Sequence, residues 1–358
     1  LLLYRKISLG IVFVLLSAWT YNSFRIFSVL FLIFYALLNK SKINIIHYPL
    51  FIILLAPITA QLLSSSGQAR YKWLTLLDGG AIAQISELRQ RPGGRLLYNK
   101  ATYLAFRFSI NYLNHFNPRF LFIDGGSQYQ FNIPGHGLLY LVSLPFFYLG
   151  LLKAFKHKMI ILWLLLSPIA GSLTRDAPHT LRAITMLPAV IIITAFGVSL
   201  VSRKFRLFQL LFTLTLLFSL DYYLNPVTLG YRTNYSWSWQ YGYKEAVQYI
   251  KDNYSKYDEI IFTKYYGEPH EFVAFYWPWD PKDFQQTRQW DYHADWYWVN
   301  SLNKIKFVVD RNMQSTISNL PSNQKTLIIS DPKFPVPGQE LKTINFLDSK
   351  PAFYIKEL

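Results

Sequence analysis

Seven apolar stretches dominate the first two thirds of the chain, and they constrain its fold more than any other feature. They contain no acid and no Lys, and they run through 7–20, 26–38, 46–63, 137–152, 159–173, 183–200 and 207–220. A helix that crosses a bilayer needs about 20 mostly apolar residues, with a range of roughly 17–25. The first two stretches reach that length only with their flanks, and one long helix over 7–38 is the alternative to two helices joined at 21–25. The pattern predicts a mainly α membrane protein with about seven transmembrane helices.

Basic clusters without acids fall at alternate ends of these stretches. They are Arg5 and Lys6; Lys40 and Lys42; Lys153, Lys156 and Lys158; and Arg203, Lys204 and Arg206. Short loops rich in Lys and Arg stay on the cytoplasmic side. The clusters therefore predict a multi-pass protein integral to the plasma (inner) membrane. We expect four parts: transmembrane helices 1–3 in 1–63, an extracytoplasmic loop with amphipathic helices in 64–136, transmembrane helices 4–7 in 137–224, and a small extracytoplasmic α/β domain in 225–358.

The net charge belongs entirely to the apolar part of the chain. Residues 1–224 hold 21 Lys and Arg against 5 Asp and Glu, and 21 − 5 = 16 is the net charge of the whole sequence. A basic excess distributed in this way argues against nucleic acid as a partner, although a basic protein often binds it. The sequence has no cysteine, which excludes disulfides and thiolate metal sites.

The segment "SLTRDAPHTLRAITMLP" contains the first candidate site. Arg175, His179 and Arg182 lie within eight positions of one another, and Pro178 suits the first turn of a helix. A helix N-terminus presents free N–H groups and a positive dipole, which favour a phosphate. The segment therefore predicts a site for a lipid phosphate or diphosphate. The alternative is an ordinary surface pair between Arg175 and Asp176.

A second basic cluster lies in the 64–136 segment, which holds eight Lys and Arg and three acids. Arg70 and Lys72, with Arg95 and Lys100, are candidates for holding an anion; attraction to lipid headgroups and a merely solvated face are the alternatives. The pieces "GGAIAQISELRQ" and "NKATYLAFRFSINYLNHF" carry apolar residues at helical spacing, so each predicts a helix.

Several of these segments resemble one enzyme family. "SAWTYNSFRIFSVLFLI", which contains Arg25, is similar to the Tyr-Tyr/His-Ser-Arg turn motif of bacterial lipid-carrier-dependent glycosyltransferases of the GT-C superfamily. These enzymes are relatives of the protein mannosyltransferases and aminoarabinose transferases. "DGGAIAQISELRQ", "NYLNHFNPRFLF", "PGHGLLYLVSLPF" and "LTRDAPHTLRAITMLPAVIIITAFG" look like the downstream segments of that group, and "YGYKEAVQYI" extends the likeness beyond residues 7–200.

The resemblance implies a glycosyltransferase of the hexosyltransferase type. It would move a sugar from a polyprenyl-phosphate carrier to a glycan or protein acceptor at the outer membrane face, with membrane lipid as a further partner; Arg25, in the turn motif, joins the candidates for binding the lipid phosphate. In such enzymes an acidic pair in an early outer loop supplies the base and any metal ligands, and this sequence contains no such loop. We therefore expect the C-terminal part of a longer enzyme, inactive by itself, with its catalytic residue unassigned and any divalent metal bound by the missing N-terminal part.

Two other functions remain open at this point. One is an oligosaccharide transferase resembling the O-antigen ligases, in which Arg and His residues of a large outer loop hold a lipid diphosphate without an acidic pair. The other is a non-enzymatic, membrane-anchored assembly or binding protein that uses the C-terminal domain.

The C-terminal part alternates helical and strand patterns. "YKEAVQYIKDNY" has an apolar face with charges outside it, which predicts an amphipathic helix. "DEIIFT", "KIKFVVD", "KTLIISD", "LKTINFL" and "AFYIKEL" are short apolar or alternating runs typical of strands. Seven of the ten tryptophans lie between Trp237 and Trp298. Their rings suit stacking on sugars, anchoring at lipid headgroups or filling a core, and a structural role is favoured.

Overall fold

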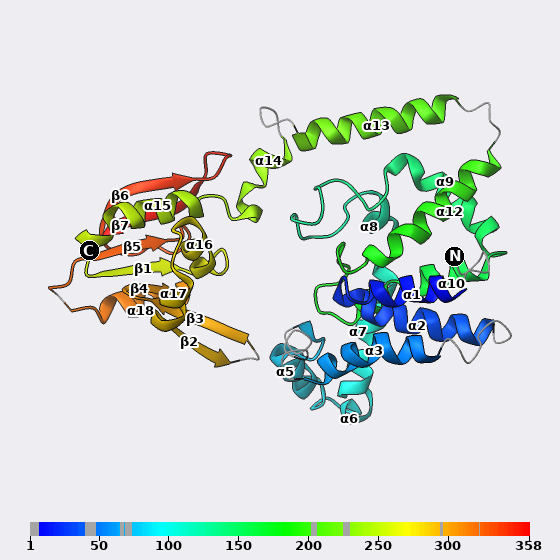
Figure 1. The fold of residues 1–358 in the computed structure, drawn as a ribbon, viewed down its shortest axis with the longest axis horizontal. Coiled ribbons are helices and arrows are strands. Elements are labelled where there is room, and N and C mark those ends of the chain that lie inside the picture. The colour runs from blue at the N-terminus through cyan, green and yellow to red at the C-terminus, as the bar shows by residue number, and fades with distance from the viewer. Residues whose placement is uncertain are drawn as a thin grey trace. The chain divides into compact units, whose positions relative to one another are not determined.

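The chain divides into two compact units, Leu1–Ser219 and Leu220–Leu358 (Figure 1). The computed structural model describes residues 7–39, 48–64, 68, 74–201, 206–224, 230–293, 296–321 and 323–358. Each unit has hydrophobic clusters of its own: the N-terminal unit is built from helices, and the C-terminal unit contains a β-sheet.

The N-terminal unit is built from helices joined by turns and irregular segments. Its elements are α1 (Ile7–Ser17), α2 (Asn22–Leu38), α3 (Tyr48–Leu63), α5 (Gly79–Leu88), α6 (Gly94–Leu97), α7 (Lys100–Asn114), α8 (Pro118–Phe122), η3 (Leu141–Ser143), α9 (Leu144–Ala154), α10 (Lys158–Leu166), α11 (Ile169–Ser172), η4 (Ile184–Met186), α12 (Leu187–Leu200) and α13 (Arg206–Leu224), which continues across the boundary between the units. Its largest hydrophobic cluster combines side chains of α8, α9, α10 and α12. A second cluster packs Phe27 and Phe31 of α2 against Trp163 of α10.

The predicted transmembrane architecture is wrong. No helix in the described part of the chain combines the length and the apolar character that crossing a membrane requires. This finding overturns the mainly α membrane fold, the seven transmembrane helices and the multi-pass location in the plasma membrane. The extracytoplasmic placement of 64–136 and of the C-terminal domain depended on those helices and falls with them. The fold combines a helical unit with an α/β unit.

Prolines explain why several apolar stretches do not form long helices. A proline has no N–H and clashes with the preceding turn, so it interrupts a helix or marks its first turn. The stretch 159–173 is interrupted at Pro168 and forms α10, of 9 residues, and the short α11. In 137–152 the helix α9 has Pro145 in its first turn and is 11 residues long. In 183–200 the helix α12 has Pro188 in its first turn and is 14 residues long.

Three helical predictions in this unit are confirmed. α1 and α2 are separate helices, so one long helix over 7–38 is excluded, but the break between them lies at 18–21 rather than at 21–25, because α2 begins at Asn22. The two helices expected between residues 79 and 116 are α5 and α7. Each begins with a side-chain cap: Asp78 accepts a hydrogen bond from the Ala81 N–H, and Asn99 accepts from the N–H groups of Ala101 and Thr102.

The C-terminal unit surrounds one mixed sheet, which has seven strands among the residues described. Its elements beyond α13 are α14 (Tyr231–Asn234), η5 (Ser236–Trp239), α15 (Tyr243–Asn253), η6 (Tyr254–Lys256), β1 (Glu259–Thr263), α16 (Pro269–Tyr276), α17 (Pro281–Thr287), β2 (Arg288–His293), β3 (Trp296–Leu302), β4 (Ile305–Val308), α18 (Asp310–Ser318), β5 (Thr326–Ser330), β6 (Gln339–Asn345) and β7 (Pro351–Glu357). The strand order is β2-β3-β4-β1-β5-β7-β6, and β4, β1 and β5 are parallel neighbours (Figure 1).

Helices cover both faces of the parallel strands. Ile260 and Phe262 of β1 join a cluster with α15 and α16, whereas Ile261 packs with Met313 of α18. Both faces of β1 are therefore buried, which is why "IIF" is a continuous apolar run rather than an alternating one. The helix predicted over "YKEAVQYIKDNY" and the five predicted strands are confirmed as α15, β1, β4, β5, β6 and β7.

Candidate functional site

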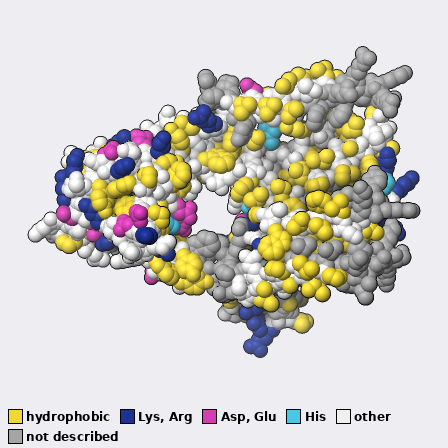
Figure 2. Space-filling view, in the orientation of Figure 1, with side chains coloured by type: hydrophobic (Ala, Val, Ile, Leu, Met, Phe, Trp, Pro, Cys, Tyr) yellow, Lys and Arg dark blue, Asp and Glu magenta, His cyan; other side chains and the backbone are white. Residues whose placement is uncertain are grey.

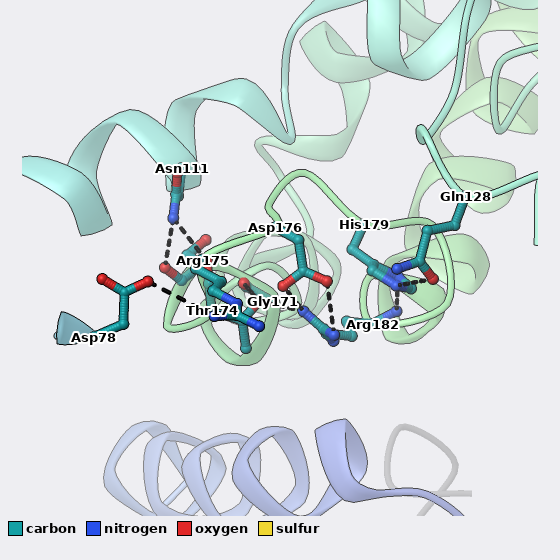
Figure 3. Close-up of polar contacts among 10 residues, drawn as sticks. Asp78, Asn111, Gln128, Gly171, Thr174, Arg175, Asp176, His179 and Arg182 are labelled. Atoms are coloured by element: carbon teal, nitrogen blue, oxygen red, sulfur yellow. Dashed lines mark hydrogen bonds and ion pairs between the residues drawn. The ribbon is translucent and has the colours of Figure 1, made fainter. Parts of the chain in front are cut away.

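The candidate phosphate site lies in an irregular segment, 173–183, between α11 and η4. The helix expected to begin at Pro178 is absent there; the residues form turns, and η4 begins only at Ile184. Hydrogen bonds from distant parts of the chain hold the segment. Asn111 of α7 donates to the carbonyls of Ser172 and Thr174, at 3.2 and 3.0 Å (Figure 3). The helix-dipole argument for anion binding therefore does not apply here, and the side chains must carry the site.

Arg182 makes the strongest polar contacts in this segment. Its Nη1 donates to Asp176 Oδ1 at 2.7 Å and to Thr174 Oγ1 at 2.7 Å, and its Nη2 donates to Asp176 Oδ2 at 3.0 Å (Figure 3). Arg182 is 8% exposed. Burial by itself raises the pKa of Asp176, but the hydrogen bonds and the charge of Arg182 outweigh burial, so the pKa lies below its ordinary value. The pair is a two-pronged, charge-assisted contact.

Arg175 has a weaker partner, from another part of the unit. Its Nη1 lies 3.6 Å from Oδ2 of Asp78, and both side chains are over two-fifths exposed. The alternative pairing of Arg175 with Asp176 is wrong, because Asp176 turns to Arg182 instead. The backbone N–H of Arg175 donates to the Leu74 carbonyl at 3.2 Å, which joins this residue to the segment before α5. An exposed pair at this distance contributes little to stability.

His179 is buried, and its ring contacts both the segment and the loop that follows α8. Nε2 lies 2.9 Å from Gln128 Oε1, and Nδ1 lies 3.4 Å from the backbone N of Arg182 (Figure 3). Since an amide oxygen accepts, Nε2 carries the proton and Nδ1 is the acceptor. The same loop is attached at a second point, because the Gly126 N–H donates to Thr180 Oγ1 at 3.1 Å.

His115, which the sequence patterns did not single out, lies fully buried behind this segment. Its Nδ1 donates to the Asn111 carbonyl at 2.7 Å, and its Nε2 has no hydrogen-bond partner among the described residues. A Cβ atom at Gly171 would lie 2.8 Å from that Nε2, so the glycine is required for the two segments to approach. Burial, together with the nearby His179, lowers the pKa of His115 to about 4, although the hydrogen bond to the Asn111 carbonyl acts in the opposite direction. One histidine in an apolar helix has no sequence signal that separates it from a core residue.

Of Arg25, Arg70 and Lys72, which are further candidates for binding the phosphate, only Arg25 lies in the described part of the chain, and no hydrogen bond or ion pair joins it to this network. Arg70 and Lys72 lie outside the described residues. Arg25 is half-buried in the first turn of α2, and its Nε is buried without a hydrogen-bond partner among the described residues. α2 contacts α11 and η4, the two elements that flank the segment.

Each of the three candidate residues has an acceptor side chain of its own within the chain. Asp176 serves Arg182, Asp78 serves Arg175, and Gln128 serves His179. An anionic ligand must therefore compete with the carboxylates. No group of three or more His, Cys, Asp or Glu side chains that could hold a metal occurs in the described ranges. The assignment of Arg25, Arg175, His179 and Arg182 to phosphate binding stays a prediction.

Comparison with known proteins adds no assignment. The chain matches no family model, no curated protein and no solved structure.

Proposed function

We propose that the N-terminal unit binds the phosphate of a polyprenyl-phosphate-linked sugar, and that the protein takes part in transferring this sugar to a glycan or protein acceptor. One observation carries the proposal: Arg175, His179 and Arg182 come together in one short, irregular segment that is hydrogen-bonded to α7 and to the loop after α8. The transfer chemistry itself is assigned to no residue of this chain.

The geometry of Arg182 is that of an oxyanion receptor. Its two terminal nitrogens donate to the two oxygens of one carboxylate, and two phosphate oxygens fit the same fork. Asp176 is a third exposed, so its side of the pair faces the surface. We propose that the carboxylate is a counterion which the phosphate displaces, with Arg175 adding a second positive charge.

The surface of the N-terminal unit supports a ligand with a long apolar tail. α1, α2 and α12 expose large hydrophobic side chains, among them Phe13 at 57%, Ile33 at 49% and Ile191 at 51%. Figure 2 shows hydrophobic side chains spread over the visible face of this unit. Exposed apolar patches of this extent mark binding surfaces. A polyprenyl phosphate combines an apolar chain with one anionic end. Both parts match residues 1–224, which expose apolar side chains and whose sequence holds the whole basic excess of the chain.

Replacing Arg182 by alanine is expected to weaken binding of a short-chain polyprenyl monophosphate by about ten- to hundred-fold. The reason is that one charge-assisted hydrogen bond is worth about 1.5–3 kcal/mol, and 1.4 kcal/mol corresponds to one decade. Arg182→Lys should recover only part of the affinity, because an ammonium group lacks the planar fork. The measurement is calorimetric titration of the full chain, with the corresponding diphosphate as a second ligand.

Two further variants separate binding from folding. Arg175→Ala removes an exposed side chain whose ion pair with Asp78 is long and weak, so it should reduce affinity while leaving the melting temperature unchanged. Arg91→Ala removes the same charge from an exposed residue of the same unit and is the matched control. If Arg175→Ala and Arg182→Lys both bind like the parent, the network is purely structural and the proposal fails.

A further inference from the structure

A second group of polar side chains gathers in the C-terminal unit, where the three parallel strands end. The register aligns Thr263 of β1 with Val308 of β4, and Phe262 of β1 with Ile329 of β5. The chain then places Asp310 two residues after β4 and Asp331 directly after β5. In open sheets with parallel strands, ligands bind outside the carboxyl ends of the strands, where neighbouring connections diverge. β1 lies at such a point, between β4 and β5.

Both carboxylates are tied to this edge. Asp310 Oδ1 accepts from Thr263 Oγ1 at 2.5 Å, and Asp331 Oδ1 accepts from the Lys333 N–H at 2.7 Å. They are close enough for the charge of Asp331 to act on Asp310, although burial is the main reason why the pKa of Asp310 lies above its ordinary value. No ion pair to either carboxylate occurs in the described residues.

Three buried oxygen atoms at the same edge have no hydrogen-bond partner among the described residues. They are Oδ2 of Asp331, Oγ of Ser330 and the hydroxyl of Tyr243, and the three residues are at most 1% exposed. The Tyr243 ring contacts Phe262 of β1 and stacks on Phe272. Burial, followed by the charges of Asp310 and Glu268, raises the pKa of its hydroxyl.

Buried polar groups in native proteins are nearly always hydrogen-bonded. Within the chain, Tyr266 is a neighbour of Asp331: burial, and then the hydrogen bond and charge of Asp331, raise the pKa of the Tyr266 hydroxyl. The hydroxyls of Ser330 and Tyr243 are left for a partner from outside the chain.

Aromatic rings complete the edge. Tyr265 follows β1 and is 37% exposed, and Phe334 follows β5 and is 40% exposed. Their centroids lie 5.9 Å apart in an edge-to-face contact. The Tyr265 hydroxyl accepts from Lys333 Nζ at 2.7 Å, which fixes the ring beside the loop of Asp331. Exposed rings next to oxygen acceptors suit a ligand that has both apolar C–H faces and hydroxyl donors.

We infer that the carboxyl edge of the C-terminal sheet binds a saccharide, with Asp331 and Asp310 accepting from its hydroxyls, Tyr243 as a further polar contact, and Tyr265 and Phe334 against its ring. A metal ion is the other ligand that carboxylates favour, but the described residues contain no group of three metal-ligating side chains. The site lies in the other unit from Arg182, so it does not depend on the proposed phosphate site.

The test is a titration of the full chain with a panel of defined neutral hexose and N-acetylhexosamine oligosaccharides. Ligand-observed NMR monitors the binding of each panel member. Asp331→Asn preserves the side-chain shape but removes the charge, and it should weaken saccharide binding about ten- to hundred-fold. Asp258→Asn is the matched control, because Asp258 is an exposed carboxylate just before the amino end of β1. It should bind like the parent, and binding of polyprenyl monophosphate should be unchanged in both variants.

Tyr243→Phe adds a readout that a structural role would not produce. A hydroxyl kept for a ligand is unsatisfied in the free protein, so its removal should raise the Tm by about 4 °C while weakening saccharide binding. A lower Tm with unchanged binding would show that the hydroxyl only supports the fold and would overturn its place in the site. The inference is overturned if no panel member binds, or if the parent and Asp331→Asn bind equally well. Internal water would then be the hydrogen-bond partner of the buried oxygen atoms. Binding of calcium or magnesium ions that is lost in Asp331→Asn would overturn the inference in favour of a cation site.

Discussion

Gly197→Val is expected to unfold the N-terminal unit. α9 and α12 cross at Gly150 and Gly197, and a Cβ atom on Gly197 would lie 1.7 Å from the carbonyl oxygen of Phe146. A Cβ on Gly150 would lie 1.8 Å from the carbonyl oxygen of Ile193. The clashing atoms belong to the backbone, so no side-chain rotation relieves them, and the two helices must separate. Their separation opens the main hydrophobic cluster of the unit.

The expected loss of stability is larger than most single mutations cause. Overpacking usually costs about 1–3 kcal/mol, and a clash with the backbone on a buried crossing should exceed about 4 kcal/mol. Total stability is typically about 5–15 kcal/mol, so little would remain. Thermal unfolding measures the change in stability, and hydrogen exchange within α12 shows whether this helix loses its protection. Gly79→Ala is the control, because nothing lies within 4 Å of a Cβ at that position. An unchanged Tm for Gly197→Val would show that the helices do not cross as described.

The second large effect is loss of stability in mild acid. Burial lowers the pKa of His115 to about 4, from an ordinary value of 6.5. Between these two values the unfolded chain binds a proton that the folded chain does not, so stability falls as the pH falls from about 6.5 towards 4. The loss amounts to about 3 kcal/mol at the lower end, because one pKa unit is worth about 1.4 kcal/mol. His270 acts in the same direction in the C-terminal unit, where burial and then the charges of Lys264 and Arg288 lower its pKa to about 4.

Hydrogen exchange separates the two contributions, since it reports on each unit. Protection in α7 should decline over this pH range in the parent and should become nearly pH-independent in His115→Asn, whose amide can donate to the Asn111 carbonyl in place of Nδ1. His157→Asn replaces an exposed histidine and should leave the pH profile of α7 unchanged. If the parent and His115→Asn lose protection in parallel, His115 is not the group that titrates.

The C-terminal unit was predictable because its signals are local. Runs such as "EIIFT" and "TLIIS" are too short for helices and are bounded by turn residues, so their type follows from a few positions. The position of acids after these runs is a further local signal. Asp331 comes directly after β5, and an acid placed after a buried strand lies at the edge where ligands bind. The strand order decides which acids lie together at that edge, and a short sequence pattern does not reveal the strand order.

In the N-terminal unit, apolar length did not determine helix length. The apolar composition of 159–173 suggests one long helix, but Pro168 divides this stretch into two short helices. The pairing of charges within the candidate site also depends on the tertiary fold. The alternative interpretation placed Asp176 beside Arg175, its neighbour in sequence, but the turns at 177–183 bring it to Arg182 instead. Arg175 pairs with Asp78, nearly one hundred residues earlier, and only the tertiary fold makes that contact.

Asp176→Asn tests the central proposal most directly, because it separates a displaceable counterion from a structural partner. The amide keeps the size of the side chain but no longer competes for the Arg182 fork as an anion. If phosphate displaces Asp176, the dissociation constant of polyprenyl monophosphate should fall by about ten-fold in Asp176→Asn and rise by about ten- to hundred-fold in Arg182→Ala. If the ion pair is structural, Asp176→Asn should lower the Tm and leave the dissociation constant at the value of the parent protein or above it, and that result would contradict a phosphate site at Arg182.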